Sequence, residues 1–111
     1  MNEPPSTPSA IALDLATKVM ASKDVLGAEL GTEVSLLNLK SGIYFSLNPV
    51  GASVWRQIQK AKTLAEIKRQ LLEEYEVETS RCEGDLRRLV LELEALGLVE
   101  FMPAGFALKE T

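Results

Sequence analysis

Histidine is absent from this chain, and cysteine occurs once, at Cys82. A single thiol excludes an intrachain disulfide and therefore the class of small secreted domains that disulfides hold together. The same shortage excludes zinc sites built from Cys and His, and it excludes Cys/His and Ser/His catalytic pairs. We expect no metal and no other cofactor.

Long apolar runs are also lacking. No stretch approaches the roughly 18–20 apolar residues that span a membrane. Residues 1–17 contain no Lys or Arg, whereas a signal peptide begins with positive charge. We therefore expect a cytoplasmic protein with no membrane partner.

Positive charge is scarce, since 12 Lys and Arg face 16 Asp and Glu and leave a net charge of −4. Binding to a polyanion such as a nucleic acid needs a basic face, so this balance argues against such a partner. What the chain does have is an ordinary globular composition, with 46% apolar and 25% charged residues in 111. That length suits one domain with a modest core.

The N-terminal segment differs from the rest of the chain. Its first nine residues, MNEPPSTPS, include three prolines and have almost nothing to bury. We expect a disordered or loosely ordered tail over residues 1–17 and a single domain over residues 18–111. The sequence AIALDLATKVM (10–20) fits either a short helix or the approach to a first strand.

Residues 24–47 have the pattern of a β meander. Strands are predicted over 25–30, 33–39 and 43–47, with the short turn Lys40-Ser41-Gly42 between the last two. In the last strand Ile43, Phe45 and Leu47 alternate with Tyr44 and Ser46, which predicts one apolar face and one mixed face.

Three helices are expected after the meander. Asn48 is a suitable N-cap and Pro49 a suitable first residue for one whose apolar stripe is Val50, Val54, Trp55 and Ile58. Capping boxes at 63–66 (TLAE) and 80–83 (SRCE) announce the other two. The apolar face of the third contains Cys82, Leu86, Leu89, Leu93 and Leu96, and Gly97 is placed to end it.

The last residues predict a small β element. The sequences LVEF (98–101) and FAL (106–108) flank Met102-Pro103-Ala104-Gly105, as in a terminal hairpin or wing. The predicted fold is therefore α+β: a winged helix-turn-helix with a three-stranded antiparallel sheet, then three helices, then a small C-terminal β element.

A winged helix suggests nucleic-acid binding first. The third predicted helix would be the recognition helix, but Arg81, Arg87 and Arg88 share it with four acids. Catalysis is less supported still, because carboxylate pairs such as Glu73-Glu74 have no partner base and suit a solvated helix surface. Cys82 and Trp55 are expected to pack in the core.

The strand 43–47 is the more informative feature. In a simple meander it lies at the edge of the sheet, and it contains neither the charge nor the proline that usually protects an edge. Either another part of the chain covers this edge, or it is open for an added strand that supplies main-chain hydrogen bonds.

Several motifs together resemble the PqqD-like family, also called recognition elements of ribosomally made, post-translationally modified peptides. They are GIYFSLNPVGASVW (42–55), TLAEIKRQLLEEYEV (63–77) and a helix that contains Asp85 and ends in LEALGLVE (93–100). The resemblance covers about 25–100. The N-terminal extension to about Met20 is not part of it, and the VGASVW form looks more like the stand-alone leader binders of lasso-type pathways.

The resemblance implies a winged helix-turn-helix and a role without catalysis. Such proteins bind the leader segment of a precursor peptide and present it to a maturation enzyme, such as a radical SAM protein or a leader protease. The leader docks as an antiparallel strand beside the third strand, in a groove closed by the third helix.

Carried onto this chain, the resemblance gives a candidate peptide-binding site. Its strand is Ile43, Tyr44, Phe45, Ser46 and Leu47, and its helical wall is Asp85, Arg88, Leu89 and Glu92. The opposite margin of the same helix, with Glu83, Val90 and Glu94, is the alternative wall. Two other functions stay open: a winged-helix nucleic-acid binder, and a homodimer formed through the open strand edge.

Overall fold

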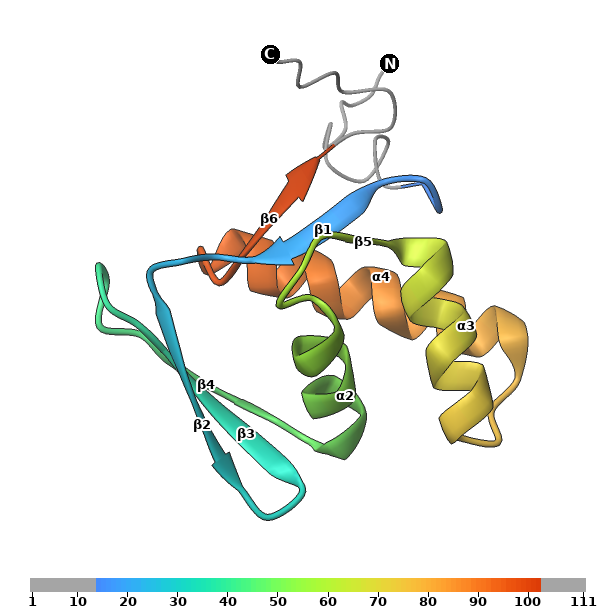
Figure 1. The fold of residues 1–111 in the computed structure, drawn as a ribbon, viewed down its shortest axis with the longest axis horizontal. Helices are drawn as coiled ribbons and strands as arrows, with labels where there is room; N and C mark the ends of the chain where they lie inside the picture. Colours follow the sequence, from blue (N-terminus) through green and yellow to red (C-terminus); the bar gives the residue numbers. More distant parts are fainter. Residues whose placement is uncertain (1–13, 103–111) are drawn as a thin grey trace, which may run out of the picture.

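A computed structural model describes residues 14–102 of the chain. Most of the expected N-terminal tail, the turn residues 103–105 and the FAL sequence at 106–108 lie outside these residues. Among the described residues, two small sheets and three helices make up the fold (Figure 1). None of the helices described is both long and apolar enough to cross a membrane.

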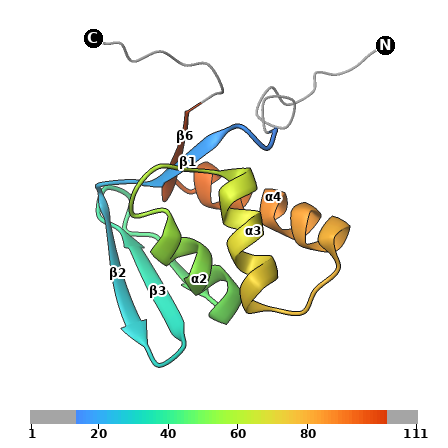
Figure 2. The ribbon, with the colours of Figure 1, turned by 45° about the vertical axis from the view of Figure 1, so that its right-hand side comes forward.

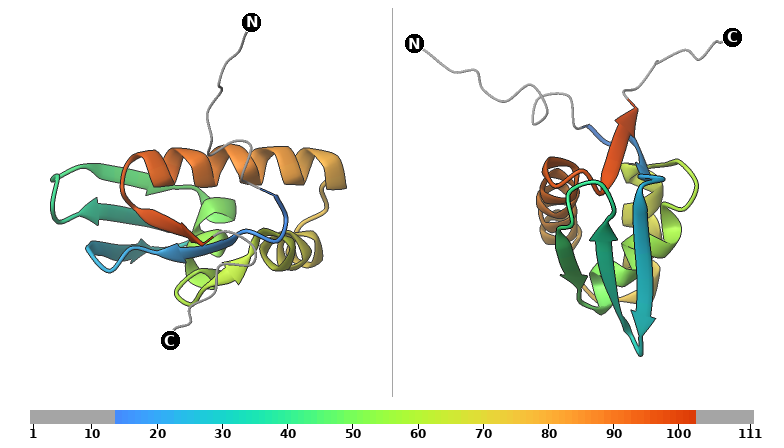
Figure 3. Two further views of the ribbon diagram at one scale, coloured as in Figure 1. Left: turned by 90° about the horizontal axis from the view of Figure 1, so that it is seen from above. Right: turned by 90° about the vertical axis from the view of Figure 1, so that its left-hand side faces the viewer.

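The predicted meander is confirmed, with small shifts of its ends. Strands β2 (Val25–Leu30), β3 (Glu33–Asn38) and β4 (Tyr44–Leu47) form an antiparallel sheet in the order β2-β3-β4. In its register Leu36 lies opposite Phe45, and Val34 lies opposite Leu47. The strand β4 is therefore an edge strand, as its position in the meander predicts (Figure 3, right).

The two faces of this sheet have different surroundings. All three helices lie on one side of it (Figures 1 and 2). Val34, Leu36 and Leu47 point to that side and are almost fully buried, because alternate residues of a strand share a face. On the same inner face, Glu29 pairs with Arg56 of a helix at 3.1 Å.

Local sequence signals explain where the first two helices begin. Helix α2 (Pro49–Gln57) follows Asn48, whose side-chain oxygen accepts a hydrogen bond from the Gly51 amide at 2.9 Å. Helix α3 (Leu64–Glu74) is capped by Thr63 and Glu66, which satisfy each other's backbone amides as the capping-box pattern predicts.

The start of the third helix differs from the prediction. Helix α4 (Thr79–Ala95) begins after Glu78 and has no side-chain cap, so the expected capping box at 80–83 is wrong. The carboxylate of Glu83 bonds instead to Arg87 on its own helix and to Lys68 on α3. A packing contact with α3 has replaced the local cap. Gly97, with φ +74°, follows the helix end as expected.

The C-terminal β element is present, but its partner was not predicted. Strand β6 (Val99–Met102) pairs antiparallel with β1 (Lys18–Ala21), and β1 also pairs with the two-residue β5 (Lys62–Thr63). The segment before the meander is thus a strand and the centre of a second sheet, ordered β5-β1-β6. This sheet forms the wing beside the helices.

The core lies between the helices and the inner faces of both sheets. Its fully buried side chains include Val19, Leu36, Ile58, Ile67 and Leu93, which come from β1, β3, α3, α4 and the end of α2. Trp55 and Cys82 are buried with them, as predicted. Val50 departs from the predicted stripe, because 40% of it is exposed.

Gly27 allows β2 to approach this core closely, and replacing it should destabilise the protein. A Cβ atom at Gly27 would lie 2.9 Å from Nε1 of the buried Trp55 side chain. We expect Gly27→Ala to lower the free energy of unfolding by ~1–3 kcal/mol. Thermal unfolding measures this, with Ala28→Val on the exposed face as the control that should change it little. Equal melting temperatures for G27A and the wild type would contradict the close approach.

Candidate peptide-binding site

Within residues 14–102 no strand pairs with the outer edge of β4, and this edge exposes main-chain groups in a defined pattern. The amide of Asn38 donates to the carbonyl of Ile43 at 2.9 Å, which places Asn38 and Ile43 in a hydrogen-bonded pair. Such pairs alternate along an antiparallel ladder, so Phe45 and Leu47 bond to β3 in the same way. The N–H and C=O groups of Tyr44 and Ser46 therefore point outward, to the open edge.

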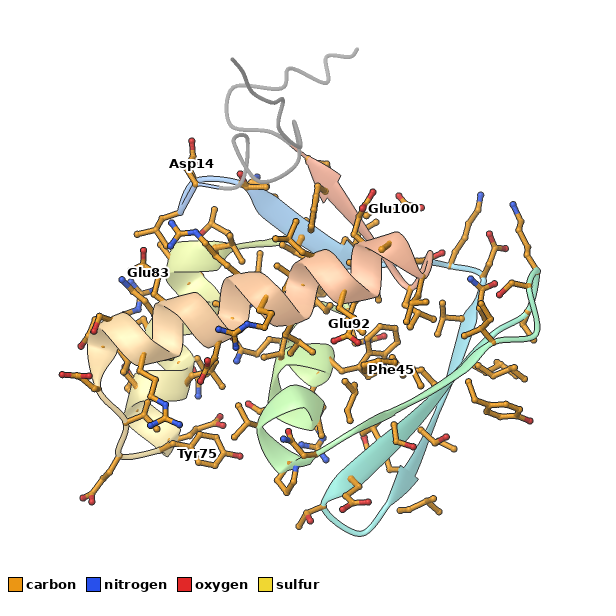
Figure 4. All side chains as sticks on the ribbon, turned by 180° about the vertical axis from the view of Figure 1, so that it is seen from behind. Asp14, Phe45, Tyr75, Glu83, Glu92 and Glu100 are labelled. Atoms are coloured by element: carbon orange, nitrogen blue, oxygen red, sulfur yellow. The ribbon has the colours of Figure 1, made fainter. Side chains whose placement is uncertain are left out.

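Helix α4 runs beside this edge (Figure 3, left). From β4 the half-buried side chain of Phe45 points toward the helix, and Glu92 extends from α4 toward Phe45 (Figure 4). Leu89, one turn before Glu92 on α4, packs against the core and is partly exposed. An open strand edge and a partly apolar helix margin thus face the same space.

The opposite margin of α4 is arranged differently. Val90 is fully buried, and Glu83 is held by Lys68 of α3 and by Arg87. Val90 and Glu83 therefore contact other parts of the protein and are not available to a peptide in the groove. Glu94 is exposed near the end of the helix.

A cavity of about 380 Å³ lies at one end of this space. It lies between the first turns of α2, the end of α3 and the first half of α4 and is open to solvent, and Asp85, Arg88 and Leu89 of the predicted wall line it. Glu92 and residues 43–47 do not line it, although Asn48, the next residue after β4, does. The predicted site residues therefore lie at the strand edge and in an adjoining pocket, except for Glu92, which lies on α4 beside Phe45 (Figure 4).

Sequence reasoning missed several residues of the pocket. Val50 and Val54 of α2, Tyr75 after α3, Val77 in the connection, and Arg81 of α4 all line it. Helical spacing assigned Val50 and Val54 to the apolar stripe of their helix. The available signal was the position of Val50 in the first turn after Pro49, where a side chain is only partly covered.

Charges along α4 largely cancel one another. Arg88 bonds to Asp85 at 2.9 Å, Arg81 lies 3.8 Å from the same carboxylate, and Arg87 pairs with Glu83. Each arginine of the helix therefore has a carboxylate beside it. Phosphate binding depends on cations that can release counterions, and this helix offers little unopposed positive charge.

Three glutamates stabilise the helices through bonds that favour their charged forms. Hydrogen bonds from Arg87 and then Lys68 lower the pKa of Glu83, and bonds from Ser53 and Gln70 lower the pKa of Glu74. The backbone amide and hydroxyl of Thr63 lower the pKa of Glu66. Burial raises the pKa of the Cys82 thiol, which keeps it protonated and unreactive.

These lowered pKa values predict the direction of acid destabilisation. A carboxylate with a lowered pKa contributes stability that is complete above its ordinary pKa, near 4.5 here, and is lost as the pH falls through the folded value. We expect the melting temperature to fall as the pH drops below about 5. In Glu83→Gln the fall should be shallower. Parallel melting curves for E83Q and the wild type over pH 3–7 would contradict this assignment.

No group of three or more His, Cys, Asp or Glu side chains that could hold a metal ion comes together within residues 14–102. The described residues of the site offer main-chain hydrogen bonds, apolar contact and a few paired charges.

The fold and site together define a winged helix-turn-helix protein with an open strand edge beside its third helix. More particularly, the chain belongs to the PqqD family, because residues 33–99 match the family model described as coenzyme PQQ synthesis protein D. The predicted resemblance is thereby confirmed. No curated protein sequence matches the chain significantly.

A solved structure supports the same assignment. It is described as "TbiB1 in Complex with the TbiA(beta) Leader Peptide" and is 34% identical to this chain. The match covers 79% of this chain and 98% of that one, with a TM-score of 0.69. The predicted α+β fold is confirmed by this similarity.

Proposed function

We propose that this protein is a non-catalytic adaptor that binds the leader segment of a ribosomally made precursor peptide. One observation carries the proposal: β4 has an open edge next to an apolar pocket, in a chain similar to a protein solved with a leader peptide bound. The leader adds as an antiparallel strand to Tyr44–Leu47 and bonds to the outward groups of Tyr44 and Ser46.

The helix α4 supplies the other wall of the groove. Leu89 and Phe45 give apolar contact, and Glu92 lies beyond them toward the end of the helix. Asp85 and Arg88 line the pocket, where the carboxylate can accept and the guanidinium can donate hydrogen bonds that orient polar groups of the leader. The pocket holds an apolar side chain of the leader among Val50, Val54 and Leu89. Micromolar affinity or better, about −8 kcal/mol, is a reasonable expectation for such a strand.

Presentation to a maturation enzyme needs a second surface, and the outer face of the sheet provides one. Leu26, Leu37 and Tyr44 form a cross-strand row on this face, away from the helices. Leu26 is 58% and Tyr44 71% exposed. Antiparallel sheets usually have a polar solvent face, so an apolar row here suits contact with another protein.

A bound leader would extend this outer face. An added strand beside β4 places every second leader side chain next to Tyr44 and Ser46 on the outer side. The enzyme then contacts the adaptor and the leader at once, which lets it distinguish the loaded adaptor from the empty one. A radical SAM protein and a leader protease both remain candidates for this enzyme, and we place the complex in the cytoplasm.

A homodimer through the sheet is the less favoured use of these surfaces. Three strands of four to six residues cover roughly 300 Å². A stable interface buries about 800 Å² on each partner. A dimer through the edge of β4 would also compete with the leader for the same main-chain groups.

An amide chemical-shift titration of the labelled protein tests the proposal. The titrant is the leader peptide of a precursor encoded close to this gene. We expect shifts concentrated at residues 43–47, around the pocket and along one side of α4, with saturation at micromolar peptide. A leader with scrambled sequence is the control. Saturable, salt-sensitive binding to duplex DNA with no response to the leader would support the nucleic-acid alternative instead.

A further inference from the structure

Asn38 uses all of its hydrogen-bonding groups to join two elements that are far apart in sequence. It is the last residue of β3 and is 7% exposed. Its side-chain Nδ2 donates to the carbonyl of Leu96 at 3.0 Å and lies 3.5 Å from that of Gly97. Its Oδ1 accepts from the amides of Lys40 and Ser41 at 2.9 and 3.2 Å.

The two elements joined are the two walls of the groove. Lys40 and Ser41 belong to the turn that leads into β4, and Leu96 follows the last residue of α4. The backbone of Asn38 holds the same turn, since its amide donates to Ile43 and its carbonyl accepts from Gly42. One side chain thus fixes the start of the strand edge relative to the end of the helix.

Gly97 makes room for this contact. It has φ +74°, and a Cβ atom there would lie 2.9 Å from Nδ2 of Asn38. An alanine at this position would therefore be strained and would also push the Asn38 amide away from the carbonyls it bonds. Asn38 and Gly97 form one structural unit, which we call the groove clamp.

We propose that the groove clamp is a positioning device that sets the separation of β4 and α4 to the width of a single added strand. The inference rests on the proposed leader binding. Strand addition requires the outward groups of Tyr44 and Ser46 to be held at a fixed distance from the helical wall. A clamp formed before binding removes the entropic cost of ordering the two walls when the leader arrives.

The substitution Asn38→Asp keeps the contacts of this side chain with the turn and removes its contacts with the end of α4. A carboxylate keeps the acceptor that Lys40 and Ser41 use, so the turn is retained. It lacks the donor for Leu96 and places a negative charge against the carbonyls at the C-terminal end of α4, where the helix dipole is also negative. Gly97→Ala disturbs the same contact from the other side.

Two measurements test the proposal. The first is the distance between spin labels at Ser46→Cys and Glu92→Cys in a Cys82→Ala background, without leader. The second is leader affinity by calorimetry with the unlabelled N38D and G97A variants. Ser53→Ala is the control, because it removes the hydrogen bond from the buried Ser53 hydroxyl to Glu74, which joins α2 and α3, and lowers stability away from the clamp.

We expect a broader and longer distance distribution in both clamp variants, together with leader binding weakened at least 10-fold. Ser53→Ala should leave distance and affinity close to those of the wild type. At acid pH the introduced carboxyl of N38D takes up a proton and can donate to Leu96, so its affinity should recover toward the wild-type value measured at the same pH. A packing defect that does not depend on the charge at position 38 would show no such recovery, and Ser53→Ala reports the effect of a general loss of stability.

Three outcomes overturn the proposal. They are unchanged distances in both variants, widened distances with normal leader affinity, and equal losses of affinity in S53A and N38D. If the wild-type protein itself binds no leader, the proposed function fails, whatever the distances show. The spin-label data then decide separately whether Asn38 sets the spacing of the two walls.

Discussion

Proline at position 46 is expected to abolish leader binding while leaving the fold largely intact. The amide of Ser46 points to the open edge of β4, so its loss removes no bond to β3. It does remove a donor that an added strand needs, and the proline ring occupies space at the edge. We expect affinity to fall at least ~100-fold, or about 3 kcal/mol, measured by calorimetry. The melting temperature should change little.

Alanine at the same position is the matched control. Ser46→Ala keeps the outward amide and removes only a hydroxyl from the exposed face, so leader affinity should stay within about threefold of the wild type. Tyr44→Pro, the next outward amide, should repeat the result of S46P. If both proline variants fold and bind the leader normally, strand addition at β4 is wrong.

The second large effect is expected on processing of the precursor rather than on leader binding. Leu26→Glu introduces a charge into the apolar row of the outer face, on the strand farthest from the leader edge. We expect enzyme-catalysed maturation of the precursor to slow at least ~10-fold, because burial of an unpaired charge opposes docking. Leader affinity should remain within about twofold of the wild type.

Gln59→Glu is the control for this experiment. It adds the same charge at an exposed position after α2 and loses only the hydrogen bond from the Gln59 side chain to the Trp55 carbonyl, away from the outer face, so maturation should proceed at the wild-type rate. Added excess of the adaptor should partly restore the rate with L26E, since a weakened contact responds to concentration. Normal maturation with L26E, at limiting adaptor, would show that the outer face does not contact the enzyme.

Much of the fold could be predicted because local signals agree with the final structure. Asn48-Pro49 and the Thr63–Glu66 capping box begin their helices where the sequence places them. The alternation of residues 43–47 gives the inner and outer faces of β4 correctly. The two helix starts satisfy backbone amides within a few residues, and the faces of β4 follow from the alternation of side chains along any strand, so tertiary contacts change neither.

The predictions that were wrong or incomplete concern elements whose structure depends on contacts between residues far apart in the sequence. Glu83 bonds to Lys68 of α3 and Arg87, so the capping box expected at 80–83 does not form. Strand β6 pairs with β1, about 80 residues earlier, and no local pattern encodes that pairing. The candidate site shows the same division: the strand edge followed from the meander, whereas the pocket needed α2, α3 and α4 to meet.

The paired charges of α4 also affect how a partner approaches the protein. With its arginines matched by neighbouring carboxylates, the helix produces a weak electric field beyond the Debye length, about 8 Å at physiological salt. The arginines of this helix therefore add little long-range attraction for an acidic peptide. Selection of a partner at this side of the groove then depends on short-range contacts, which are the main-chain bonds of one added strand and the fit of its side chains.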